Sequence, residues 1–80
     1  MKTKYYAASK KGNILGREIM TVYITDSDNV KNEYGISAFD VCDPGFVQQQ
    51  ISEHAQVYET KITKIEVYTR TGKRFKTIVL

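Results

Sequence analysis

The chain has 80 residues, of which 41% are hydrophobic and 26% charged, with five glycines and one proline. A chain of this length builds one modest core, and this composition is not that of a disordered, collagen-like or low-complexity sequence. One cysteine excludes an internal disulfide, no apolar run is long enough to span a bilayer, and the first residues lack the apolar core of a signal peptide. We therefore expect a single domain over residues 1–80 in the reducing cytoplasm.

The net charge of +3 is unevenly distributed along the chain. Residues 1–17 carry five basic side chains and no acid, residues 18–59 carry eight acids against Lys31 alone, and residues 60–80 carry six basic side chains against Glu66 alone. If the two basic ends lie together in space, the molecule has one basic and one acidic side. The simpler reading is that these blocks are ordinary solvated surface.

Residues 2–9 and 14–25 predict a first β-hairpin. The second run is rich in β-favouring residues, and Gly12 or Asn13 can supply the positive φ that the turn between the runs needs. Alternation within the second run places Met20, Val22 and Ile24 on one face. The residues from Asp26 to Asn29 then read as a loop.

A second hairpin is predicted from Ile62 to Leu80. A three-residue loop ending in Gly72 joins its two strands, which places Val67 opposite Phe75 and Ile65 opposite Thr77. One face then carries Ile65, Val67, Phe75, Thr77 and Val79. The other face carries Lys64, Glu66, Tyr68, Arg74, Lys76 and Ile78.

A helix is predicted between the hairpins. Asp43 is suited to be its N-cap and Pro44 its first residue, and the helix should end between His54 and Gln56. Helical spacing turns Phe46, Val47, Ile51 and Ala55 inward and leaves Gln48, Gln49, Gln50, Ser52 and Glu53 mostly outward. Residues 32–42 fit either a short strand or an extra helical turn.

Together these elements predict an α+β fold with a two-layer ββαββ plan: a four-stranded antiparallel sheet with one helix packed on one face. A helix of about 12 residues is roughly 18 Å long and does not cover four strands. Part of the sheet is therefore expected to meet solvent, a second copy of the chain or a partner.

Groups able to catalyse a reaction are few. Cys42 and His54 are the only cysteine and histidine, and the predicted helix holds them roughly 16 Å apart. The cysteine reads more simply as a small buried side chain. The sequence contains no metal-ligand spacing, no phosphate-binding glycine loop and no pair of acids in contrasting environments. We therefore predict a protein that is not an enzyme and uses no metal or cofactor.

Basic and aromatic side chains gather on the sheet face predicted to point away from the helix. Such side chains neutralise phosphates and stack on unpaired bases, but they are also common on half-exposed strands and at protein interfaces. The candidate binding residues of this face are Tyr5, Arg17, Tyr23, Lys64, Tyr68, Arg74 and Lys76. A second, acidic candidate surface contains Asp26, Asp28 and Glu33.

Two functions fit these patterns. The first is a small non-enzymatic protein that docks on a protein partner by a sheet face, a sheet edge or its acidic segment. Such a protein would act as an inhibitor or regulator of the type that phages and mobile elements encode. The alternative is a nucleic-acid-binding module that uses the basic, tyrosine-bearing face. A homodimer formed through that half-apolar face also fits, whereas no feature predicts a membrane partner.

Overall fold

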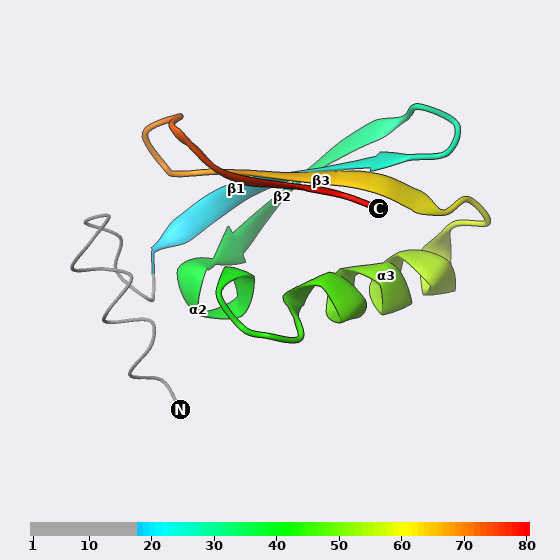
Figure 1. Cartoon of the computed structure of the whole chain (residues 1–80), viewed down its shortest axis with the longest axis horizontal. Helices are drawn as coiled ribbons and strands as arrows, with labels where there is room; N and C mark the ends of the chain where they lie inside the picture. Colours follow the sequence, from blue (N-terminus) through cyan, green and yellow to red (C-terminus); the bar gives the residue numbers. More distant parts are fainter. Residues whose placement is uncertain (1–17) are drawn as a thin grey trace.

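Within residues 18–80, which the computed structural model describes, four strands form one antiparallel sheet with two helices on one of its faces (Figure 1). The elements in chain order are β1 (Ile19–Asp26), β2 (Lys31–Ser37), α2 (Ala38–Val41), α3 (Phe46–Val57), β3 (Ile62–Tyr68) and β4 (Arg74–Val79). The strand order is β2-β1-β3-β4, so β2 and β4 are the edge strands.

The predicted four-stranded antiparallel sheet is confirmed, and the ββαββ plan fits in outline. Two details differ. The segment between the hairpins holds two helices, because Ser37 caps the short helix α2 before α3 begins. In addition, β1 has β2 on one side and β3 on the other, so its hairpin partner is not residues 2–9. The predicted strand 2–9, its turn and residues 14–17 lie outside the described residues.

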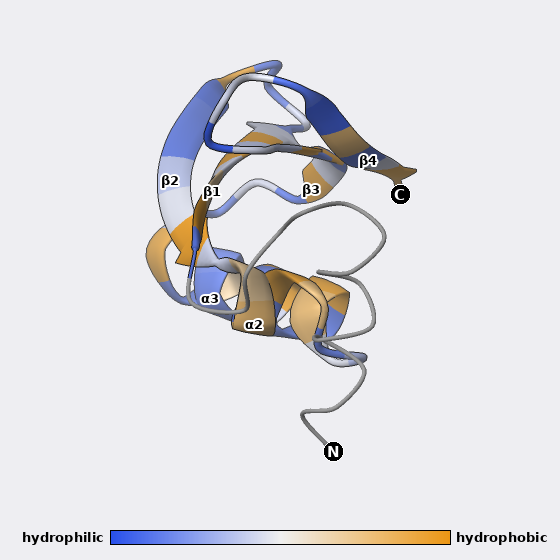
Figure 2. Ribbon diagram, turned by 90° about the vertical axis from the view of Figure 1, so that its left-hand side faces the viewer, coloured by the Kyte–Doolittle hydropathy of each residue, from blue (hydrophilic) through white to orange (hydrophobic). Residues whose placement is uncertain are grey.

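The hydrophobic core lies between the sheet and the two helices (Figure 2). Met20, Val22 and Ile24 alternate inward along β1 and are at most 4% exposed, as their spacing predicts. The other core residues are Ile62, Ile65 and Val67 of β3, Ala38 and Val41 of α2, and Phe46 of α3. Burial of each of the larger side chains contributes about 1.5–3 kcal/mol, so this small cluster is the main source of stability.

The predicted register of the second hairpin holds only next to its loop. Tyr68 pairs with Arg74 as expected, but a bulge in β4 then pairs Val67 with Lys76 instead of Phe75. Gly72 has the left-handed conformation predicted for the loop, with φ 92°. The loop thus fixes only the nearest pair, and one extra residue beyond it moves Lys76 to the helix side of the sheet.

The predicted start and inner face of the helix are wrong in detail. Asp43 does not cap α3. Its carboxylate accepts the N–H of Gly45 at 2.8 Å, Gly45 is the N-cap, and the helix starts at Phe46 instead of the predicted Pro44. The inner face of α3 carries Phe46, Gln50 and His54, whereas Ile51 and Ala55 are exposed. Gln50 and His54 therefore face inward, where the periodicity predicts Ile51 and Ala55.

The inner face of α3 can be tested with two truncations. Phe46→Ala should lower the free energy of unfolding by about 3–5 kcal/mol, because it empties a site that is 1% exposed. Ile51→Ala, at a site 38% exposed, should cost less than about 1 kcal/mol. Urea unfolding followed by circular dichroism measures both, and equal losses would contradict this orientation of the helix.

Candidate functional site

The outer face of the sheet, opposite the helices, carries four of the predicted binding residues. By register, Tyr23, Lys64, Tyr68 and Arg74 share this face, and several of its side chains line a shallow hollow of about 360 Å³. Lys76 does not belong to it. The β4 bulge turns its side chain inward, where its ammonium donates to the carbonyl of Val41 at 3.2 Å. Tyr5 and Arg17 lie outside the described residues.

The charges of this outer face are largely paired with one another. Glu66 Oε1 lies 3.5 Å from the ammonium of Lys31 and 3.8 Å from that of Lys64, and Arg70 lies 3.6 Å from Glu18. The ring of Tyr23 meets that of Tyr68 edge to face, with centroids 5.6 Å apart. The face therefore carries both signs of charge: two lysines share the Glu66 carboxylate, and Arg74 forms no ion pair with a described residue.

Asp26 does not belong to the predicted acidic surface, because its side chain is buried. Asp28 and Glu33 are exposed, but Asp26 is only 5% exposed and is part of a hydrogen-bond network. Its Oδ1 accepts the N–H groups of Asp28 and Val30, each at 2.9 Å, and its Oδ2 accepts the Thr60 hydroxyl at 2.9 Å. Aspartate at a strand end commonly binds backbone N–H groups of the following turn, and here that preference buries the carboxylate.

The network continues from Thr60 to α3. Thr60 Oγ1 also lies 3.1 Å from His54 Nε2. Because the single hydroxyl proton of Thr60 is donated to Asp26, Nε2 of His54 must carry a proton and donate to Thr60. The chain of contacts from Asp26 through Thr60 to His54 thus ties the end of β1 to the last turn of α3.

These contacts lower the pKa of Asp26. The hydrogen bond from the Val30 N–H, followed by those from Thr60 and Asp28 and by the nearby His54, lowers its pKa below 3.8, against an opposing effect of burial. These bonds favour the charged form, so a network with a neutral Asp26 is weaker.

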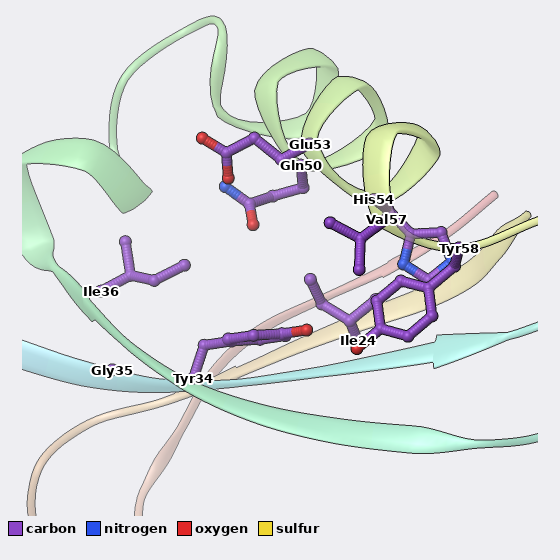
Figure 3. Close-up of a pocket in the computed structure, with 9 residues that line it drawn as sticks. All are labelled: Ile24, Tyr34, Gly35, Ile36, Gln50, Glu53, His54, Val57 and Tyr58. Atoms are coloured by element: carbon purple, nitrogen blue, oxygen red, sulfur yellow. The ribbon is translucent and has the colours of Figure 1, made fainter.

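A groove that sequence reasoning missed lies between β2 and α3 (Figure 3). It encloses about 440 Å³, with inward side chains of β1 and β2 as its floor and the second half of α3 as its wall. The lining residues are Ile24, Tyr34, Gly35, Ile36, Gln50, Glu53, His54, Val57 and Tyr58. Its only sequence signal is the alternation of Tyr34 and Ile36, which is too short to distinguish a strand from a helical turn.

The polar groups of the groove differ in how they are satisfied. The Tyr34 and Tyr58 side chains hydrogen-bond to each other, which together with burial raises the pKa of Tyr34, and the Tyr58 ring stacks on His54 with centroids 4.5 Å apart. Gln50 is 6% exposed, yet its side-chain amide forms no hydrogen bond with any described residue. A ligand bound in the groove would contact the Gln50 amide.

The described residues do not form a catalytic or metal-binding constellation. Cys42 precedes α3 and His54 lies in its last turn, and burial raises the pKa of the Cys42 thiol despite the opposing effect of Lys76. Between residues 18 and 80, no three His, Cys, Asp or Glu side chains gather closely enough to hold a metal ion. Among the described residues, the groove between β2 and α3 is therefore the candidate site considered for a function.

Comparison of the chain with protein-family models, with curated proteins and with solved structures finds no match. Among the described residues, neither helix has the length and apolar character needed to cross a membrane. The geometry of the groove is therefore the basis for a proposed function.

The role of Asp26 predicts how stability depends on pH. The folded pKa is below the unfolded one, so the unfolded chain binds protons more readily as the solution is acidified. The stabilisation is complete above the unfolded pKa near 3.8 and is lost as the pH falls through the lower, folded pKa. Asp26→Asn should therefore be less stable than the wild type at pH 7 and should lose less stability on acidification.

Urea unfolding between pH 3 and 7 measures this difference. Asp28→Asn is the matched control, because its carboxyl is exposed and forms no hydrogen bond with the described residues, and it should change stability by less than about 0.5 kcal/mol. If Asp26→Asn and the wild type have the same stability and the same acid profile, the network does not anchor the helix.

Proposed function

We propose that this chain is a small non-enzymatic protein-binding domain that receives an extended segment of a partner protein along β2. The observation that carries the proposal is the position of the groove, which runs beside an edge strand and contains inward side chains of that strand. A domain of this kind would act on its partner as an inhibitor or regulator.

Strand β2 has the features of an edge that can accept another strand. It pairs with β1 in seven consecutive registered pairs without a bulge, and no described strand pairs with its other side. An edge strand of this kind presents unpaired N–H and C=O groups. An added segment gains main-chain hydrogen bonds there, and alternate side chains enter an adjoining pocket.

The opposite edge is less suited to docking. Strand β4 is interrupted by a bulge, and its Lys76 fills the space beside α3, with its ammonium 5.5 Å from the centroid of the Phe46 ring. Among the described strands both edges are unpaired, but β2 is the regular edge with a groove beside it.

Nucleic-acid binding through the outer face remains the second proposal, and the described geometry supports it less. Phosphate binding needs free cations and base stacking needs free ring faces. Lys31 and Lys64 instead neighbour Glu66, and Tyr23 and Tyr68 pack against each other. Among the predicted cations of that face, Arg74 forms no ion pair with the described residues.

Two matched substitutions test docking at the groove. Val57 lines the groove and is 74% exposed, and Val79 on β4 is 77% exposed. Neither Val57→Lys nor Val79→Lys should unfold the chain, because both sites face solvent. Affinity capture from host lysate should yield a stoichiometric protein with the wild type and with Val79→Lys, whereas Val57→Lys should reduce its affinity at least tenfold.

The other outcomes are equally informative. Loss of the partner on Val79→Lys alone would place docking at β4 and contradict the proposal. Capture that nuclease abolishes, and that falls steeply with added salt, would favour nucleic-acid binding. Recovery of the chain itself as the only partner would indicate a homodimer.

A further inference from the structure

We infer that the groove between β2 and α3 binds a cationic side chain, a lysine or arginine of the partner's extended segment. This inference rests on the proposed docking along β2 and adds the chemical class of the residue that is recognised. It follows from four properties of the groove: its aromatic rings, its charge, its apolar floor and one amide that no described residue hydrogen-bonds.

Aromatic rings stand at the floor and at one end of the groove. Figure 3 shows the Tyr34 ring lying along the floor and the Tyr58 ring near the end of α3, with their hydroxyls turned toward each other. His54 stacks on Tyr58 at an interplanar angle of 27°. Ring faces carry negative potential, and an ammonium or guanidinium within about 6 Å of a ring centroid is attracted to it.

The charge around the groove favours a cation over an anion. Glu53 lines the groove from α3, and the last turn of that helix carries the partial negative charge of the helix dipole. A carboxylate in the groove would be repelled, whereas a lysine or arginine would be attracted.

The apolar part of the groove matches the stem of the same side chains. Ile24, Ile36 and Val57 line it, and lysine and arginine lay methylene stems along such surfaces while their charged heads reach polar groups. The amide oxygen of Gln50 is an available acceptor for that head. A leucine would fill the apolar part and exclude water from the Gln50 amide without replacing its hydrogen bonds, which is unfavourable.

The experiment compares the full-length chain's affinity for three capped peptides, Gly-Ser-Thr-Val-X-Val-Thr-Ser-Gly. In these peptides X is lysine, norleucine or glutamate, and norleucine keeps an apolar stem without the ammonium. Nuclear magnetic resonance titration follows the amides of Tyr34, Gly35 and Ile36. We expect the lysine peptide to bind about three- to tenfold more tightly than the norleucine peptide, from one cation–π contact and one partly exposed ion pair. The glutamate peptide should bind most weakly.

Two variants locate the source of this preference. Glu53→Gln should reduce the preference for lysine over norleucine by about two- to fivefold, because it removes the carboxylate that lines the groove. Glu59→Gln removes the same charge from an exposed position that does not line the groove, and it should leave the preference nearly unchanged.

The outcomes separate this inference from the proposed function. Equal binding of the lysine and norleucine peptides would show that the groove is only apolar, which overturns the inference and leaves docking along β2 standing. Absence of binding by all three peptides at millimolar concentration would also overturn it, while the Val57→Lys comparison would still decide docking.

One further outcome concerns the chain's own basic residues. A variant with Lys2, Lys4, Lys10 and Lys11 changed to glutamine tests this. If the lysine peptide binds that variant but not the wild type, the groove selects cations but takes them from residues 1–17 of this chain, and the inference of a partner segment is wrong.

Discussion

The buried carboxylate of Asp26 determines where α3 stands relative to the sheet. It accepts hydrogen bonds from the turn after β1 and from Thr60, and Thr60 contacts His54 in the last turn of the helix. At the other end of α3, Phe46 enters the core close to Lys76 of β4. A helix of twelve residues held at both ends in this way leaves the β2 side of the sheet uncovered, and the groove is the space that remains.

Side-chain alternation and turn chemistry predicted the parts of the fold that are governed by local rules. They located the buried face of β1, the second hairpin with its loop at Gly72, and a helix between the hairpins. They did not predict the bulge in β4, because a hairpin loop fixes only the pairs next to it. The bulge in turn moved Lys76 from the outer face to the inner one.

The groove was not predictable because its residues break the usual association between polarity and exposure. The pattern places Gln50 outward and Asp26 on an acidic surface because polar residues are mostly exposed, and it assigns no face to His54. His54 and Asp26 are instead buried in a hydrogen-bond network that joins positions 26, 54 and 60, which are distant in sequence. Hydrophobic periodicity contains no information about such long-range polar contacts.

The outer face of the sheet and the groove differ in how their charged side chains are arranged, and this difference affects which partner segment the groove would select. On the outer face, Lys31 and Lys64 lie beside Glu66, and Arg70 lies beside Glu18, so cationic and anionic side chains are intermixed. Main-chain hydrogen bonds along β2 would be the same for any extended segment, so they cannot distinguish one partner from another. Selection therefore has to come from the groove, where the Glu53 carboxylate, the Gln50 amide and two tyrosines lie beside an edge that is otherwise indifferent to sequence.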